Sequence, residues 1–559
     1  MRLSPQERVV SKLVPAIEEK LNEVQDNISL GDWEIDETGV WRDKKLFDRN
    51  GNVKATTTEY ASPIPVLPTA LLVNLDSNIE KLELSFFKHN RWQQLITERS
   101  VTANKSAIIK LADKGLEVNS ENATMMVKYI ADVVAASLPY LPHKPAKSVM
   151  GWVDDEFVPY TDKIAFDGDD QFKYLYKAIC KKGTLDEWVN FVGKLRYNLD
   201  LRLCMAAAFA SPLIELIGEN PFVFHLWGGT GSGKTVALMV AMSIFGDPAM
   251  GKLTRTMNMT ANSMLSTAAF LRNLPFAGDE LQIIKSRWTN YDNLIMCITE
   301  GIDRGRMTYD KVNEMKSWKC SFLFTGEEPC VKAASGGGTV NRVIQVECTR
   351  KIVANGNMVA NFVRTHYGCA GQPYIERVKQ VDVTSLYQHW FDQIMIDGVE
   401  NAQSATTDKQ AGAMALMLTA DQIASELFWP HERSLTLDDV RPYLRSESDV
   451  DIAERAYQFI RNCIAENQNN FSQEAKQVWG GIQNGYAYIN KNVLCRVLEE
   501  QGFDFDAVKA KWADRGYLEK SGQGRYHHHL MIAGAKAMYM KIALSPPTEP
   551  EELEEVIRA

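Results

Sequence analysis

A glycine-rich turn between two apolar segments places the strongest constraint on how this chain folds. The segment FVFHLWGGTGSGKTVALMV (Phe222–Val240) has an apolar run on each side of a glycine cluster that ends in Lys-Thr. Gly228, Gly233, Lys234 and Thr235 fit the pattern G-x-x-x-x-G-K-[ST], with a predicted strand before it and a predicted helix after it. Because the motif and its context agree, we expect a phosphate-binding P-loop here and not a chance turn.

Each P-loop residue has an expected role in binding ATP and Mg²⁺, the cofactors that this motif predicts. Backbone N–H groups at the start of the helix face the phosphates, and Lys234 reaches the β- and γ-phosphates. The hydroxyl of Thr235 is an expected ligand of Mg²⁺. The expected nucleotide-binding residues are Gly228, Gly229, Thr230, Gly231, Ser232, Gly233, Lys234 and Thr235.

An acidic pair follows another apolar run, in the segment NLPFAGDELQ. Asp279 is expected in the coordination shell of Mg²⁺, and Glu280 is expected to orient and polarise a water molecule. A water nucleophile implies hydrolysis of the nucleotide and not transfer to a substrate hydroxyl. A surface Asp-Glu pair is the alternative, but the position at the end of a predicted buried strand favours the catalytic role.

Two further candidate residues lie at the ends of apolar runs. Thr325 ends the run CSFLFT, where a polar side chain can sense the γ-phosphate from a neighbouring strand. Arg342 directly precedes the run Val343–Cys348, and an arginine there can stabilise transition-state charge in the site of a neighbouring subunit. A surface arginine at the start of a strand is the alternative, which the spacing leaves open.

Composition excludes several classes of protein. The 559 residues are 45% hydrophobic and 24% charged, which is ordinary for a globular protein of roughly three or four domains. The formal net charge of −9 means that any contact with nucleic acid must come from local basic features. Scattered cysteines without a CxxC pair predict a reduced, cytoplasmic protein without a zinc ribbon. Because Pro212 and Glu215 interrupt the apolar stretch Leu203–Gly218, a buried helix is expected there and no membrane span.

Periodicity along the chain predicts an α/β protein of several parts. Alternating apolar and polar residues predict hairpins at Trp33–Asp43, around Thr38-Gly39, and at Lys81–Thr102, with His89-Asn90 at its turn. The expected parts are an N-terminal helix plus β-rich domain at 1–148, a hairpin and helical connector at 149–218, an ATPase core at 219–355, a helical lid at 356–449, a winged-helix domain at 450–544 and an acidic disordered tail at 545–559. A winged helix contacts DNA in some proteins and docks other proteins elsewhere, and the sequence leaves both open.

Four blocks of the sequence together resemble the ATPase domain of a family of mobile-element proteins that includes the Cch helicases of staphylococcal cassette chromosomes. These blocks are FHLWGGTGSGKT, LPFAGDELQ, RGRMTYDKVNEMKSWKCSFLFTGEEP and GGGTVNRVIQVEC. The similarity covers most of Trp152–Leu544 and is strongest over Phe222–Cys348. Members of this family are AAA+ ATPases similar to the MCM replicative helicases.

The resemblance implies an AAA+ P-loop ATPase core with a helical lid, a β-rich N-terminal domain and a C-terminal winged helix. The Lys-Thr pair of the P-loop then belongs to the Walker A motif, and the acidic pair belongs to the Walker B motif. Thr325 stands at the sensor 1 position, where MCM proteins usually have Asn. Arg342 stands at the position of the arginine finger, and Lys409 stands where an arginine sensor 2 is expected.

The resemblance also implies where DNA binds. In MCM-like proteins the segment between the Walker B and sensor 1 strands is the presensor hairpin, which lines the central pore of a ring. Arg304–Lys319 has this place here, and Arg304, Arg306 and Lys311 are the expected DNA-binding residues. A solvated surface hairpin of mixed charge is the alternative.

The function implied by the resemblance is an ATP-dependent DNA helicase or translocase that serves replication of a mobile genetic element. It would work as a ring of identical subunits, expected to be a hexamer, on a single strand in the pore and on forked duplex DNA. The 3′→5′ polarity follows from the likeness to MCM alone. The alternative is a nucleotide-controlled AAA+ switch that binds DNA or remodels protein partners without unwinding.

Overall fold

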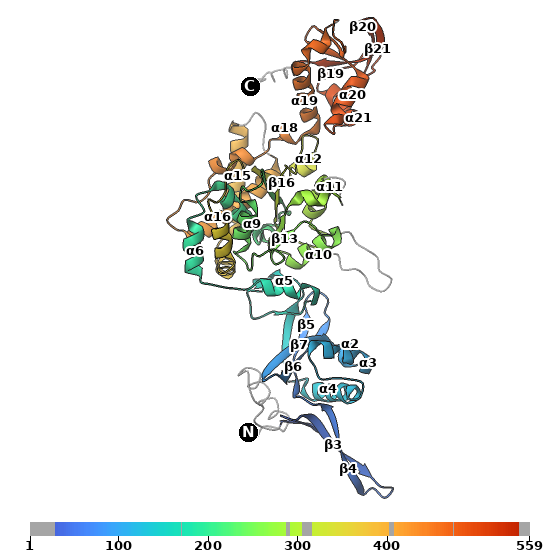
Figure 1. Ribbon diagram of the computed structural model, residues 1–559, viewed down its shortest axis with the longest axis vertical. Coiled ribbons are helices and arrows are strands. Elements are labelled where there is room, and N and C mark those ends of the chain that lie inside the picture. The colour runs from blue at the N-terminus through green and yellow to red at the C-terminus, as the bar shows by residue number, and fades with distance from the viewer. Residues whose placement is uncertain are drawn as a thin grey trace, which may run out of the picture. The chain divides into compact units, whose positions relative to one another are not determined.

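The computed structural model describes residues 28–168, 170–286, 291–303, 316–401, 407–472 and 474–546. The chain forms two compact units, Met1–Lys173 and Tyr174–Ala559, and each is described by itself (Figure 1). Three expected features fall outside the described residues: the N-terminal helix, the basic segment 304–315 and nearly all of the acidic tail.

The N-terminal unit begins with an antiparallel sheet in the order β1-β2-β3-β4. Its strands are Ile28–Leu30 (β1), Trp33–Asp36 (β2), Gly39–Phe47 (β3) and Val53–Ser62 (β4). Asp36 pairs with Gly39 across the turn, which confirms the hairpin expected around Thr38-Gly39. Trp33 is fully buried and packs edge-on against Tyr129, with ring centroids 5.4 Å apart.

A second sheet, in the order β11-β8-β5-β6-β7, shares a hydrophobic core with the first sheet and with helix α4. The bounds are Val66–Asn74 (β5), Glu80–Lys88 (β6), Arg91–Glu98 (β7), Arg99–Thr102 (α2), Lys105–Ile108 (α3), Ala123–Ser137 (α4), His143–Lys147 (β8) and Ala165–Phe166 (β11). A separate hairpin consists of Gly151–Val153 (β9) and Glu156–Val158 (β10).

Two features of this sheet bear on the expectations from the sequence. His89 and Asn90 have φ values of 54° and 56°, and this left-handed turn between β6 and β7 confirms the second predicted hairpin. Strand β11 pairs in parallel with β8, so the sheet continues past residue 148, where the sequence suggests a domain boundary. A strand of two residues has no periodicity from which it could be predicted.

The larger unit is built on a parallel sheet in the order β13-β14-β15-β12-β16. Its strands are Val223–Trp227 (β12), Thr254–Thr256 (β13), Phe276–Asp279 (β14), Phe322–Gly326 (β15) and Val343–Glu347 (β16). Four of these are the apolar runs identified in the sequence. Because the strands are parallel, the residues that follow β12, β14 and β15 meet at one edge of the sheet.

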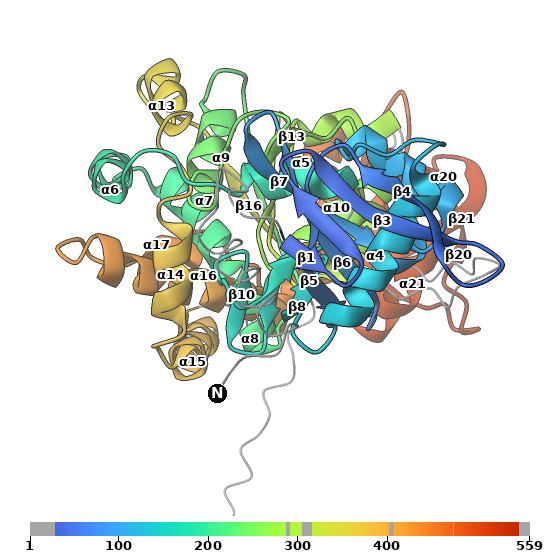
Figure 2. The same ribbon diagram turned by 90° about the horizontal axis from the view of Figure 1, so that it is seen from below.

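Helices surround this sheet. They are Lys173–Ala178 (α5), Leu185–Gly193 (α6), Leu199–Ala210 (α7), Leu213–Ile217 (α8), Lys234–Met242 (α9), Ala261–Leu271 (α10), Tyr291–Thr299 (α11), Gly337–Val340 (α12), Gly356–Val363 (α13), Gly371–Val378 (α14), Val383–Asn401 (α15), Asp408–Phe428 (α16), Leu437–Val440 (α17) and Glu447–Val450 (α18). Helix α7 is buried from Leu201 to Ala210 and packs against α9 and α16 (Figure 2). The apolar stretch Leu203–Gly218, for which one buried helix was expected, is divided between α7 and the short helix α8, which begins after Pro212.

A buried cluster of charges joins α16 to the segment around α7. Asp421 is 1% exposed and accepts hydrogen bonds from Arg202 at 2.6 and 3.0 Å and from Arg196 at 3.2 Å. The backbone N–H of Leu435 donates to the same carboxylate at 2.7 Å. The guanidinium of Arg196 also lies over the ring of Trp429, 4.0 Å from its centroid. Two buried guanidinium groups therefore share the carboxylate of Asp421, and Arg196 also donates to Glu432 at 3.2 Å.

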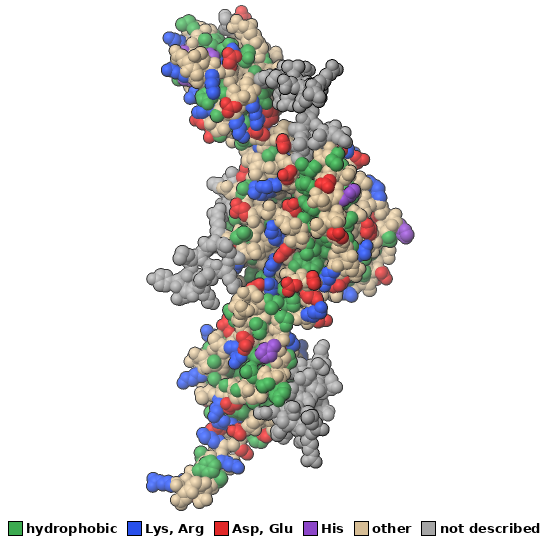
Figure 3. Space-filling model, turned by 180° about the vertical axis from the view of Figure 1, so that it is seen from behind, with side chains coloured by type: hydrophobic (Ala, Val, Ile, Leu, Met, Phe, Trp, Pro, Cys, Tyr) green, Lys and Arg blue, Asp and Glu red, His purple; other side chains and the backbone are tan. Residues whose placement is uncertain are grey.

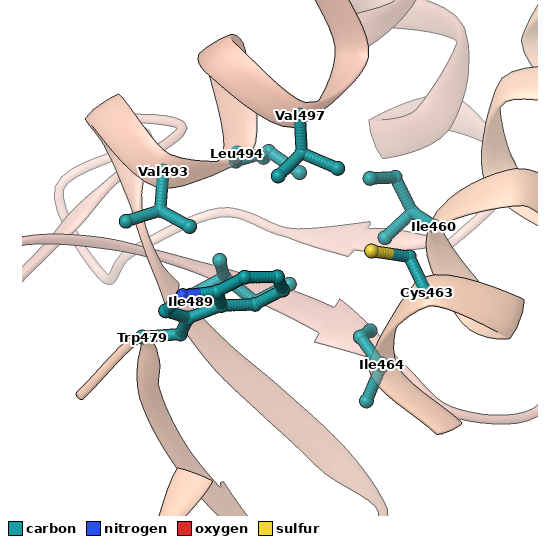
Figure 4. Close-up of a pocket in the computed structure, with 8 residues that line it drawn as sticks. All are labelled: Ile460, Cys463, Ile464, Trp479, Ile489, Val493, Leu494 and Val497. Carbon is teal, nitrogen blue, oxygen red and sulfur yellow. The ribbon is translucent and has the colours of Figure 1, made fainter. Parts of the chain in front are cut away.

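The C-terminal domain of this unit has the predicted order of two helices followed by a β-hairpin. The bounds are Ile452–Glu466 (α19), Gly480–Gln483 (β17), Tyr486–Asn490 (β18), Lys491–Glu500 (α20), Phe505–Asp514 (α21), Leu518–Glu519 (β19), His528–Ile532 (β20) and Ala535–Ala543 (β21). The helices and the antiparallel sheet β17-β18-β21-β19 enclose a core of their own. Figure 4 shows an apolar pocket in this core, lined by α19, α20, β18 and the indole of Trp479. Since its lining has no charged group, it is not suited to a nucleotide.

The distribution of charged side chains and the lengths of the helices are those of an ordinary globular protein. Basic and acidic side chains are interspersed on the face that Figure 3 shows. Among the residues with an assigned structure, no helix combines the length and the apolar character that crossing a membrane requires. The same residues contain no cluster of His, Cys, Asp and Glu that is suited to holding a metal ion by itself.

The charge cluster leads to a stability prediction. We expect Asp421→Asn to lower the free energy of unfolding by about 3–5 kcal/mol, because the loss of one partner leaves buried charge without compensation. Asp438→Asn is the control, since that side chain is 80% exposed and its ion pair with Arg441 is worth about 1 kcal/mol or less. Thermal unfolding followed by circular dichroism measures both, and equal midpoints for the two variants would contradict the prediction.

Candidate nucleotide site

The P-loop connects β12 to α9, as the motif predicts, and its glycines have conformations that other residues avoid. Gly228, Gly231 and Gly233 have φ values of 142°, 82° and 93°. A Cβ atom at Gly228 would lie 2.9 Å from the carbonyl oxygen of Cys348, which directly follows β16, so only glycine fits here beside the neighbouring chain segment. A Cβ atom at Gly229 or Gly231 would meet nothing within 4 Å, so the outer side of the loop is open to a ligand.

Lys234 is held inside the loop by oxygen atoms. Its ammonium donates to the carbonyl oxygens of Gly228 and Gly229 at 2.8 and 2.9 Å and to the Ser232 hydroxyl at 3.2 Å. The residue is 9% exposed. A buried ammonium needs such acceptors, and phosphate oxygens offer stronger ones of the same kind. The residues present therefore fit the phosphates of ATP.

A cluster of oxygen atoms connects the P-loop helix to the two strands beside it. The Thr235 hydroxyl lies 3.0 and 3.1 Å from the two carboxylate oxygens of Asp279. The Thr325 hydroxyl donates to the same carboxylate and accepts the backbone N–H of Glu280 at 3.2 Å. A hydroxyl beside a carboxylate is a suitable ligand pair for Mg²⁺, which prefers oxygen. This carboxylate is 6% exposed, so the pair lies at the inner end of the site.

Glu280 differs from Asp279 in its surroundings although the two are adjacent. It directly follows the last residue of β14, has a φ of 62° and is exposed. A left-handed conformation is uncommon for residues other than glycine, and such residues concentrate at functional sites. Thr325 holds the peptide between the two acids, so a single hydroxyl contacts both members of the acidic pair.

Arg342 and the P-loop lie at opposite ends of the parallel strands: Arg342 is at the N-terminal ends and the P-loop is at the C-terminal ends. Arg342 directly precedes β16, and the first residue of that strand, Val343, pairs with the first residue of β12. A strand of this length spans about 16 Å, so the P-loop at the far end of β12 is out of reach. The guanidinium of Arg342 donates to the carbonyl oxygen of Gly338 and to the sulfur of Met296, both at 2.9 Å.

Lys409 lies near these N-terminal ends of the strands and not near the P-loop. The first turn of α16 is anchored there, because the Gln410 side chain donates to the carbonyl oxygens of Val340 and Val343 at 2.6 and 3.1 Å. Lys409 itself is exposed. The helix therefore presents its N-terminal end beside Arg342.

The three expected DNA-binding residues, Arg304, Arg306 and Lys311, lie outside the described residues. The chain on the two sides of them is described, and Ile302 forms an antiparallel bridge with Ser317. The backbone N–H of Asp303 donates to the carbonyl oxygen of Lys316 at 2.8 Å. The two ends of this segment therefore lie side by side.

Sequence reasoning missed two polar groups near the P-loop. His225 of β12 is fully buried, neither ring nitrogen has a partner among the described residues, and burial lowers its pKa to about 3, so the ring is neutral at pH 7. Glu327 accepts a hydrogen bond from the Thr230 hydroxyl at 2.7 Å. The histidine inside an apolar run and the acids directly after Thr325 were the signals for them in the sequence.

Comparisons with known proteins bear on the whole chain. The family described as domain of unknown function (DUF927) matches residues 33–318, more than half of the 559 residues. The family described as the Cch helix turn helix domain matches residues 451–545. No curated protein matches the sequence.

A solved structure described as SCCmec type IV Cch, active helicase, matches with a TM-score of 0.68 and 17% identity, over 92% of this chain and 98% of that chain. The chain therefore shares its mixed α/β fold, with a β-rich N-terminal region and a C-terminal helix-turn-helix domain, and the expected likeness to the Cch family is supported. The apo A form of the NrS-1 C-terminal region matches with a TM-score of 0.26 and 11% identity, over 67% of this chain and 90% of that chain. That score is too low to support a fold argument.

The position of Thr325 leads to a prediction for nucleotide hydrolysis. We expect Thr325→Val to lower kcat for ATP about 10- to 100-fold, since a hydrogen bond to a charged group contributes about 1.5–3 kcal/mol. Thr325→Ser keeps the hydroxyl and should keep most of the rate. Steady-state phosphate release at saturating ATP measures both variants, and a full rate for Thr325→Val would exclude the hydroxyl from the site's function.

Proposed function

We propose that this chain, which belongs to the DUF927 family, is an ATP-dependent DNA helicase or translocase of a mobile genetic element. The observation that carries the proposal is the oxygen cluster of Thr235, Asp279 and Thr325 beside the buried ammonium of Lys234. The start of α9 and the ends of β14 and β15 each contribute one of these oxygen-bearing side chains. The fold shared with a Cch protein described as an active helicase supports the same conclusion.

In the proposed site each residue has a distinct task. Lys234 exchanges its loop carbonyls for phosphate oxygens, while Thr235 and Asp279 would hold Mg²⁺, which neutralises charge on the phosphates when bound. Glu280 orients a water molecule and accepts its proton as hydrolysis proceeds. Thr325 keeps the two acids in place from the neighbouring strand.

We further propose that the active form is a ring, with Arg342 of each subunit completing the site of its neighbour. The distance between Arg342 and the P-loop of its own chain supports this, because an arginine that stabilises the transition state must reach the phosphates. A head-to-tail contact forms a ring when its rotation closes on the first copy, and we propose such a closed rotation here. A hexamer and an AAA+ core similar to that of the MCM helicases are the proposed forms.

For DNA we propose the segment that carries Arg304, Arg306 and Lys311. Ile302 and Ser317, on the two sides of this segment, form an antiparallel bridge, which supports the proposal because the two ends of a pore hairpin must meet. Positive side chains on such a hairpin would follow phosphates of a single strand in the pore, with 3′→5′ movement as the proposed direction. The helix-turn-helix domain is a second candidate for DNA contact.

The alternative proposal is a nucleotide-controlled switch that binds DNA or remodels protein partners without unwinding. Both proposals require the same ATP site, so hydrolysis alone does not separate them. Separation of the strands of a forked duplex does.

The first test combines hydrolysis with strand separation. Glu280→Gln should still bind ATP but lose about 10²-fold or more in turnover, which is the contribution of a positioned catalytic base. Lys234→Ala should weaken binding or abolish turnover. The wild-type protein should separate a fluorescently labelled fork in the presence of ATP, and both variants should fail. ATP hydrolysis by the wild type without any strand separation would favour the switch.

The second test concerns the ring. Arg342→Ala should bind nucleotide but lose about 10³-fold or more in hydrolysis, the contribution of an arginine supplied from a neighbour. Mixing it with Lys234→Ala should restore activity, because some interfaces then combine an intact P-loop with an intact arginine. Arg377→Ala, which removes a half-buried arginine paired with Glu426, serves as the control and should keep the wild-type rate. Normal hydrolysis by Arg342→Ala, together with no recovery on mixing, would refute the assignment.

A further inference from the structure

The loop that leads into Arg342 is held from two sides. Residues 332–336, called here the finger loop, form the last part of the connection from β15 to α12, and Arg342 follows α12. On one side the carboxylate of Asp292 in α11 accepts the Ser335 hydroxyl at 2.9 Å and the backbone N–H of Gly336 at 2.8 Å. Since α11 also carries Met296, which contacts the guanidinium of Arg342, one helix holds both the loop and the arginine.

On the other side the C-terminal domain holds the finger loop through Arg455 of α19. Its guanidinium donates to the carbonyl oxygens of Ala333 and Ser335, and at 3.3 Å to that of Lys332. It also donates at 3.3 Å to the carbonyl oxygen of Val450, the last residue of α18, two residues before α19 begins. One planar guanidinium therefore joins three carbonyls of the loop to the start of the C-terminal domain.

Apolar contact adds to these hydrogen bonds. Ala334 of the finger loop packs against the hydrophobic core of the C-terminal domain. A Cβ atom at Gly502, between α20 and α21, would lie 3.3 Å from the Cβ of Ala334. The loop is thus in contact with the helix-turn-helix region and not only with the end of α19.

The three glycines after Ser335 show how close these contacts are. A Cβ atom at Gly337 would lie 2.9 Å from the carbonyl oxygen of Val450, which is too short for any side chain. A Cβ atom at Gly338 would lie 3.1 Å from the Arg342 guanidinium. A Cβ atom at Gly336 would have only an ordinary contact, 3.8 Å from Asp292. Gly337 therefore allows Val450 to approach the start of α12, and the adjacent Gly338 allows the Arg342 guanidinium to do so.

We propose that Arg455 is a positioning residue for Arg342: the C-terminal domain sets the place of the finger loop, and thereby the arginine that acts in the neighbouring subunit. This inference rests on the proposed function of Arg342. Through this contact, a displacement of the C-terminal domain changes hydrolysis at the next site of the ring. The carbonyl contacts of Arg455 carry no chemistry of their own, so its role is to hold geometry.

The test is a double-mutant cycle on the full chain. Arg455→Ala should lower kcat for ATP about 10- to 100-fold, the scale of a small misplacement of a catalytic group, and leave KM within about twofold. The kcat of Arg455→Lys should fall between those of the wild type and Arg455→Ala, since one ammonium replaces only part of the guanidinium fork. The double variant Arg342→Ala/Arg455→Ala should be no slower than Arg342→Ala, because the second change has nothing left to position.

Two controls separate positioning from general damage. Arg461→Ala removes another arginine of α19, one that donates to Leu544 inside its own domain, and should keep the wild-type kcat. Gly337→Ala should reproduce the loss of Arg455→Ala, whereas Gly336→Ala should be close to wild type. If Arg455→Ala does not fold, the comparison of Gly337→Ala with Gly336→Ala still tests whether the contact between the finger loop and the C-terminal domain positions Arg342.

The outcomes distinguish the positioning role of Arg455 from the proposed trans-acting role of Arg342, on which it rests. If Arg342→Ala hydrolyses ATP normally, the trans-acting arginine is wrong and the positioning role falls with it. If Arg342→Ala is inactive while Arg455→Ala and Gly337→Ala keep full kcat, only the positioning role is overturned. Losses that multiply in the double variant overturn it as well, because Arg455 would then act independently of Arg342.

Discussion

The candidate nucleotide site depends on the hydrogen bonds that the carboxylate of Asp279 accepts. It accepts hydrogen bonds from Thr235, at the start of α9, and from Thr325, on the strand between β14 and β12. Because Thr325 also accepts the backbone N–H of Glu280, three elements distant in sequence hold one another in position. The parallel strand order makes this possible, since all three strand ends face the same edge. A movement of any of these strands would change the whole cluster.

The opposite edge of the sheet, formed by the N-terminal ends of the parallel strands, carries Arg342 and not the P-loop. There, Arg342 and the first turn of α16 lie where no P-loop of the same chain can reach them. In the proposed function this separation is the reason for assembly, because a site at one edge is completed by an arginine from the opposite edge of the next copy. The C-terminal domain contacts this second edge through Arg455. The proposed catalytic site and the proposed control of it therefore belong to different edges of one sheet.

Local features of the site and fold could be predicted because neighbouring residues determine them. The P-loop glycines, the acidic pair, Thr325 at a strand end and the turn at His89-Asn90 all depend on short-range patterns. Other features could not. The partners of Asp421 lie more than 200 residues away in the chain, at Arg196 and Arg202, and no periodicity connects them. His225 is unusual only because it is buried and has no hydrogen-bond partner in the part of the chain that the structure describes, which depends on the neighbouring strands.

The sequence alone determined which residues are expected to bind phosphate and where the strands that position them end, because glycine conformation, side-chain chemistry and apolar periodicity act over a few residues. Only the tertiary structure decided which strand ends lie together. The order β14-β15-β12 brings Thr325 to Asp279, and the pairing of β12 with β16 keeps Arg342 away from its own P-loop. It also decided that Arg455 contacts the finger loop. Such contacts form between groups distant along the chain, and only the packing of the folded protein specifies them.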